Sequence, residues 1–135
     1  MGKSEGNCIY LMDDAKTISK KVMKAVTDAG PTVPNSEKPE VIQNLFTFLD
    51  IVSTKDTYDY FNEKYNDCSI RYGDLKKQLA ADIVAYTEPI REKIVEYSAN
   101  TEYLAKVAKQ GAERAQESAA KTLKEVREII GFREI

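Results

Sequence analysis

Apolar residues recur every three or four positions through most of this sequence, and that period is the strongest constraint on its fold. The pattern is clearest in residues 41–52, where the apolar positions are Val41, Ile42, Leu45, Phe46, Leu49 and Val52. Because an α-helix has 3.6 residues per turn, this spacing places them on one helical face. Only six glycines and four prolines occur in 135 residues, which argues against a loop-rich or all-β fold. We therefore predict an all-α fold.

Caps and helix breakers divide the chain into a short non-helical N-terminal arm, residues 1–12, and a helical bundle of five or six helices, residues 13–135. Asp13 and Asp14 can cap the first helix. The residues expected to be buried in that helix are Ile18, Val22 and Val26, and Gly30 is expected to follow its end. Later helices are expected to begin near Pro39, at Lys55 after a Thr54 cap, at Asp74 and at Thr101.

The last two predicted helices are long. One follows an apolar spacing that continues across Pro89, and a proline inside a helix removes a hydrogen bond. We expect either one bent helix or two helices broken near Pro89. The last helix is predicted to run from Thr101 to Ile130 and to stop at Gly131. Small residues in the middle of its stripe, including Gly111, would let another helix approach closely.

Composition excludes several kinds of site. The chain contains no histidine, so it cannot provide a Ser-His-Asp triad or a histidine metal ligand. Cys8 and Cys68 are the only cysteines, and we interpret them as reduced thiols. Asp13 and Asp14 lack further spaced ligands, so capping is preferred and no metal site is predicted. No run of 18 apolar residues is present, so we expect no membrane span, and the reduced thiols favour a cytoplasmic protein.

The first seven residues form a polar, glycine-containing loop that could bind a polyphosphate. Met1 and Gly2 would contribute backbone N–H groups, Lys3 a mobile positive charge and Ser4 a hydroxyl donor. The spacing does not match the phosphate-binding pattern G-x-x-x-x-G-K-[ST]. Residue chemistry alone therefore leaves a flexible tail as an alternative.

This loop, Met1-Gly2-Lys3-Ser4-Glu5-Gly6-Asn7, resembles the end of the K-M-S-K-S-x-G-N loop of class I aminoacyl-tRNA synthetases. The residues that follow are similar to those of tryptophanyl-tRNA synthetases, notably Tyr10-Leu11-Met12-Asp13-Asp14, Ile18 and the run from Lys20 to Asp28. Gly2 stands where the family has a serine, and the first lysine of the motif would precede Met1. The resemblance implies the C-terminal portion of a bacterial-type enzyme of this family.

The resemblance also implies a function and partners. The parent enzyme would activate tryptophan with ATP and magnesium and then charge its tRNA, with Lys3 and Ser4 as catalytic residues and Met1, Gly2, Lys3 and Ser4 contacting ATP or pyrophosphate. Residues 1–12 would be the remnant of the catalytic loop with its entry arm, and residues 13–135 the anticodon-side domain. A missing N-terminal catalytic domain, tRNA and a second copy in a homodimer would be the partners, and this chain alone would be inactive.

RNA contact would depend on local basic residues, because the net charge is −2 and the pI is about 5.3. The exposed candidates on the last predicted helix are Arg114, Lys121, Lys106 and Lys109. Ordinary solubilising charges remain an alternative for each of them. Two other interpretations of the whole chain also stay open, a fragment of a tyrosyl-tRNA synthetase and a standalone helical protein-interaction module.

Overall fold

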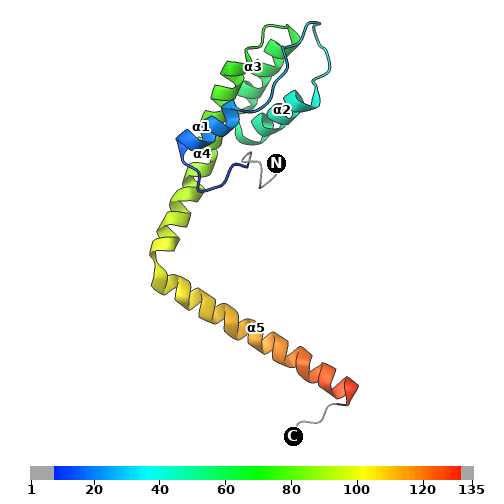
Figure 1. Cartoon of the computed structure of the whole chain (residues 1–135). Coiled ribbons are helices and arrows are strands. Elements are labelled where there is room, and N and C mark those ends of the chain that lie inside the picture. The colour runs from blue at the N-terminus through cyan, green and yellow to red at the C-terminus, as the bar shows by residue number, and fades with distance from the viewer. Residues whose placement is uncertain (1–7, 132–135) are drawn as a thin grey trace. The chain divides into compact units, whose positions relative to one another are not determined.

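The computed structural model describes residues 8–131, and over that range the chain forms five α-helices and no β-strand (Figure 1). The helices are α1 (Ala15–Met23), α2 (Glu40–Val52), α3 (Lys55–Asn66), α4 (Tyr72–Ala99) and α5 (Thr101–Ile130). The predicted all-α class and the helix count are confirmed. The chain divides into two compact units, residues 1–92 and residues 93–135, and each is described by itself.

The first unit holds the hydrophobic core, to which α1, α2, α3 and α4 all contribute. Its fully or nearly buried members include Ile18 of α1, Phe46 of α2, Tyr65 of α3 and Leu79 of α4. The apolar face predicted for residues 41–52 supplies four of the buried side chains, Ile42, Leu45, Phe46 and Leu49. Val41 is 40% exposed and lies at the edge of that face.

Side-chain caps fix the helix ends where the sequence predicted them. The Asp14 carboxylate accepts a hydrogen bond of 2.8 Å from the Thr17 N–H at the start of α1. Thr54 caps α3 by accepting a hydrogen bond from the Thr57 N–H. Gly131 follows α5 with a φ of 75°, a left-handed conformation that glycine adopts without strain.

The first helix is shorter than predicted, and Val26 is not buried. Helix α1 ends at Met23, and the side chain of Val26 is 73% exposed. The cause is a tertiary contact. The ammonium of Lys76, itself a buried residue of α4, donates hydrogen bonds to the Ala25 carbonyl at 2.7 Å and to the Thr27 hydroxyl at 3.3 Å. The Ala25 carbonyl therefore pairs with α4, and the chain leaves the helical path before Val26.

Helix α4 begins at Tyr72, two residues before the predicted cap Asp74, and continues without a break through Pro89. The chain therefore forms one continuous helix here and not two helices broken near Pro89, and the bend stays a prediction. Its buried residues lie before the proline, from Leu75 to Thr87. The N-terminal half of α4 thus belongs to the core, whereas Tyr97 after the proline is 47% exposed.

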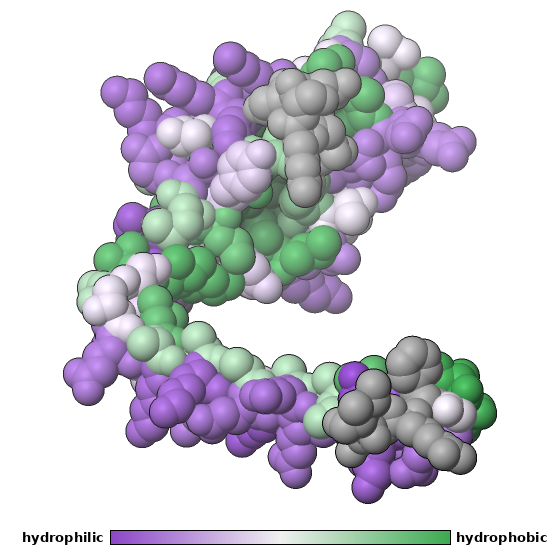
Figure 2. Space-filling model, turned by 60° about the horizontal axis from the view of Figure 1, so that its bottom comes forward, coloured by the Kyte–Doolittle hydropathy of each residue, from purple (hydrophilic) through white to green (hydrophobic). Residues whose placement is uncertain are grey.

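Helix α5 presents its apolar stripe to solvent. None of its residues is buried, and Leu104, Val107, Leu123 and Val126 are each between 44% and 49% exposed. Figure 2 shows this stripe as a hydrophobic side of the helix opposite a hydrophilic side. A Cβ added to Gly111 would meet no atom within 4 Å. The space beside Gly111 is thus open within residues 8–131, and the approach of another helix at this position stays a prediction.

Candidate functional site

The predicted phosphate-binding residues Met1, Gly2, Lys3 and Ser4 lie outside the described residues, but the structure describes the segment that follows them. That segment closes a turn in which the Asp13 N–H donates to the Tyr10 carbonyl at 3.0 Å. In return, the Tyr10 N–H donates to the Asp13 carboxylate at 2.9 Å. The Lys21 ammonium donates to the same carboxylate oxygen at 2.5 Å and lies 4.8 Å from the centroid of the Tyr10 ring. We call this arrangement the Tyr10–Asp13 turn.

The turn keeps Asp13 ionised. The hydrogen bond from Lys21 holds the pKa of the Asp13 carboxyl below its usual value, because it stabilises the charged form. Asp14 likewise has a lowered pKa, because it accepts hydrogen bonds from Thr17. Both carboxylates are thus engaged by protein donors, and the cap interpretation is confirmed for Asp14, whereas Asp13 closes the turn before α1. Among residues 8–131 no group of three or more histidine, cysteine, aspartate or glutamate side chains could hold a metal ion.

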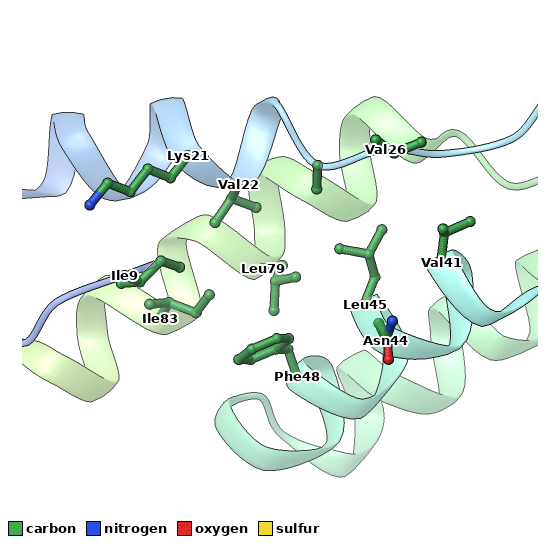
Figure 3. Close-up of a pocket in the computed structure, with 11 residues that line it drawn as sticks. Ile9, Lys21, Val22, Val26, Val41, Asn44, Leu45, Phe48, Leu79 and Ile83 are labelled. Atoms are coloured by element: carbon green, nitrogen blue, oxygen red, sulfur yellow. The ribbon is translucent and has the colours of Figure 1, made fainter. Parts of the chain in front are cut away.

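An apolar cleft of about 240 Å³ opens in the first unit beside the Tyr10–Asp13 turn. Figure 3 shows Ile9 and Ile83 near one end of it and Val41 near the other, with Leu79 and Phe48 between them. Its polar lining residues are Lys21 and Asn44. The cleft suits an apolar group and offers no nucleophile or acid–base pair. Its contribution to the site is that Ile9, close to the candidate loop, packs against the core.

The four basic residues proposed to contact RNA all lie on α5, in the second unit. Arg114, Lys121, Lys106 and Lys109 are exposed. The structure gives none of them an ion-pair partner in the part of the chain that it describes. Arg114 and Lys121 are separated by about 10 Å along the helix axis, on nearly the same face. Their positive groups are therefore accessible to a ligand.

A second cleft, which the sequence analysis missed, lies where α3 meets α4. Its volume is about 280 Å³, and its lining residues are Tyr60, Phe61, Lys64, Ser69, Arg71 and Asp74. We call it the α3–α4 cleft. The spacing of four between Tyr60 and Lys64 could have indicated an aromatic ring and a cation on one helical face. Arg71 comes from the turn before α4, and only the folded structure brings it to the same cleft.

The chain is similar to known proteins along almost its whole length. Residues 1–88 match the family described as "tRNA synthetases class I (W and Y)". The tryptophan–tRNA ligase of Porphyromonas gingivalis is 71% identical over 133 residues, which cover 98% of this chain and 41% of that protein. The tryptophan–tRNA ligase of Clostridium longisporum is 36% identical over 98% of this chain and 39% of its own length.

Solved structures agree with these relatives. The crystal structure of tryptophanyl-tRNA synthetase from Campylobacter jejuni matches with a TM-score of 0.77 at 25% identity, over 98% of this chain and 42% of that one. A second structure of the same enzyme, complexed with ADP and tryptophan, has the same fold over this region. The chain thus spans about 40% of the length of the relatives that it matches. Since the family match covers more than half of the residues, the chain belongs to the class I tRNA synthetases of the tryptophan and tyrosine group.

Proposed function

We propose that this chain is part of a tryptophan–tRNA ligase, an enzyme that activates tryptophan with ATP and transfers it to its tRNA. The observation that carries the proposal is the 71% identity to the Porphyromonas gingivalis ligase over nearly the whole chain. A tyrosyl-tRNA synthetase is not favoured, because the relatives above are named for tryptophan. A standalone interaction module is not favoured either, since 98% of the chain matches part of a ligase.

In this proposal the first residues contact the triphosphate. Lys3 places its ammonium against the pyrophosphate that leaves during activation, where negative charge is redistributed in the transition state. Ser4 donates its hydroxyl to the same phosphates, and the backbone of Met1 and Gly2 completes the contact. Magnesium neutralises further phosphate charge. The Tyr10–Asp13 turn supports this role, because its hydrogen bonds and the packed Ile9 fix the chain just beyond the loop.

The remaining partners follow from the same proposal. The helical domain approaches the anticodon of the tRNA, and Arg114, Lys121, Lys106 and Lys109 of α5 supply contacts to it. The rest of the ligase supplies the tryptophan and adenine pockets, and the enzyme is a homodimer in the cytoplasm. Of the helices in residues 8–131, none is both long enough and apolar enough to cross a membrane.

Activity is expected only when this segment is joined to the rest of the ligase. The full-length enzyme should catalyse tryptophan-dependent exchange between ATP and pyrophosphate, whereas the 135-residue chain should stay at background. The physical reason is that the chain lacks histidine and spans only 41% of its relative, so it cannot form the whole adenylation site. No tryptophan-dependent exchange by the full-length enzyme, or clear exchange by the chain alone, would contradict the proposal.

Helix α5 is expected to contribute to tRNA binding through a small number of phosphate contacts. Arg114→Ala and Lys121→Ala in the full-length ligase should each weaken tRNA binding and lower the salt slope by about 0.7, the value for one contact on a single strand. The measurement is a salt titration with cognate tRNA and with tRNA carrying a substituted anticodon. Lys55→Ala is the control, because Lys55 is an exposed lysine at the start of α3 and lies outside α5. Equal curves for all three variants would refute the role of Arg114 and Lys121.

A further inference from the structure

The α3–α4 cleft combines an exposed aromatic ring with two cations. The ring of Tyr60 is held edge-on by Phe61, with centroids 5.1 Å apart, and the Tyr60 residue is 54% exposed. The Lys64 ammonium lies 5.8 Å from the centroid of the same ring. The buried Phe61 ring thus packs nearly perpendicular to the Tyr60 ring, and part of the Tyr60 surface stays open to a planar ligand.

Side-chain hydrogen bonds hold the turn that closes the cleft. Asp67 accepts hydrogen bonds from the N–H of Ser69 at 2.9 Å and from its hydroxyl at 2.5 Å. Cys68 between them has a φ of 60°, a left-handed conformation that is uncommon for cysteine. The neighbouring loop has a second such residue, Asn35 with a φ of 57°, whose N–H donates to the Asn66 carbonyl at 3.0 Å. Such backbone conformations gather at ligand-binding sites, where they hold groups in place.

The cations of the cleft are only weakly neutralised. Arg71 is exposed and has no ion-pair partner in residues 8–131. Lys64 lies 3.9 Å from Oδ2 of Asp67, at the long end of the range for an ion pair, while Ser69 donates to Oδ1 of the same carboxylate. Asp74, the acidic residue of the lining, lies 4.0 Å from Lys77. A guanidinium beside a fixed aromatic ring is therefore available to an anionic ligand.

We infer that the α3–α4 cleft binds a single unpaired nucleotide of the tRNA, with its base stacked on Tyr60 and its phosphate held by Arg71 and Lys64. This inference rests on the proposed function, which supplies RNA as the ligand. Proteins bind unpaired bases by stacking them on aromatic rings and bind their phosphates through arginine and lysine. Residues 39–100 carry seven basic and eleven acidic side chains, so non-specific attraction cannot explain binding here and a defined contact is required. Asp74 can accept a hydrogen bond from an amino group on the base edge.

The test uses the full-length ligase and separates tRNA binding from chemistry. Tyr60→Ala and Arg71→Ala should each raise the KM for tRNA in the charging reaction about tenfold, as expected for a lost stacking or phosphate contact. The kcat at saturating tRNA should change by less than about twofold, because binding energy lost equally from ground and transition states leaves kcat unchanged. Tyr60→Phe and Arg71→Lys should restore much of the affinity, since the ring face and the charge are retained.

Tyr86→Ala is the matched control for Tyr60→Ala, because Tyr86 of α4 is 55% exposed and lies outside the cleft. The KM for tRNA in this variant should equal that of the wild type. Equal KM values for Tyr60→Ala, Arg71→Ala and Tyr86→Ala would overturn the inference. So would a phosphopeptide that binds the wild-type cleft and is displaced by neither tRNA nor an unpaired oligonucleotide. Tryptophan-dependent ATP–pyrophosphate exchange by the wild type tests the proposed function separately, because that reaction needs no tRNA.

Discussion

Replacing Lys3 with alanine in the full-length ligase is expected to slow tryptophan activation about a hundredfold, the effect of removing one charged donor aimed at a developing negative charge. The Lys3 ammonium contacts the leaving pyrophosphate in the proposed mechanism. Its interaction is strongest in the transition state, so kcat should fall more than the KM for ATP rises. The measurement is the rate of tryptophan-dependent ATP–pyrophosphate exchange at varied ATP concentration.

Two comparisons make the Lys3 result specific. Lys3→Arg keeps the charge and should retain more activity than Lys3→Ala. Lys55→Ala removes an exposed lysine at the start of α3 and should exchange at the wild-type rate. Neither alanine variant should change the free energy of unfolding by more than about 0.5 kcal/mol, the usual limit for surface substitutions. A normal exchange rate for Lys3→Ala would show that Lys3 does not act in tryptophan activation. The first seven residues would then be interpreted as a tail without a catalytic role.

The helices could be predicted from the sequence because their signals are local. The apolar period of residues 41–52 and the caps Asp14 and Thr54 each depend on neighbours within one or two turns. The position of Val26 could not be predicted in the same way. Its exposure follows from Lys76, which lies 51 residues after Ala25 and accounts for the early end of α1. Spacing along one helix carries no information about such a distant hydrogen bond.

The candidate sites also differ in whether neighbouring residues or distant contacts define them. The motif that includes Lys3 and Ser4 is contiguous, so resemblance alone could identify it. The α3–α4 cleft is assembled from Tyr60 and Lys64 on one helix and Arg71 after a turn, and their proximity depends on the left-handed conformation of Cys68. The apolar stripe of α5 could be predicted from its spacing. That spacing does not say what, if anything, covers the stripe.

The largest loss of stability is expected from Phe46→Ala, at about 3–5 kcal/mol in the free energy of unfolding. Phe46 is fully buried in the centre of the first unit. Its ring packs edge-on against Tyr58 at 5.7 Å and against Tyr65 at 6.1 Å. Alanine would lose both aromatic contacts and leave a cavity among side chains that α2 and α3 hold in place. Near-ultraviolet circular dichroism during urea unfolding measures the effect, because it reports tyrosine packing.

Contacts of Lys38 with the Phe46 ring should increase the loss of stability that Phe46→Ala causes. Its ammonium lies 4.7 Å from the centroid of the Phe46 ring and 4.8 Å from that of Tyr65, and it donates to the Asn62 side chain at 2.8 Å. Burial lowers the pKa of Lys38, because the charged form loses hydration. A cavity at position 46 would admit water, remove one cation–π contact and move this pKa back toward its ordinary value.

The coupling between Lys38 and Phe46 can be measured with a double-mutant cycle. Lys38→Met keeps the length and apolar stem of the side chain and removes its charge. The Lys38→Met and Phe46→Ala effects should be non-additive by about 0.5–1 kcal/mol, the range for a partly exposed cation–π pair. Phe46→Leu is the matched control for volume, and it should cost less than Phe46→Ala because it fills most of the cavity. Strictly additive effects would show that the ammonium lies near the rings without stabilising them, and a loss of less than about 1 kcal/mol for Phe46→Ala would contradict its place in the core.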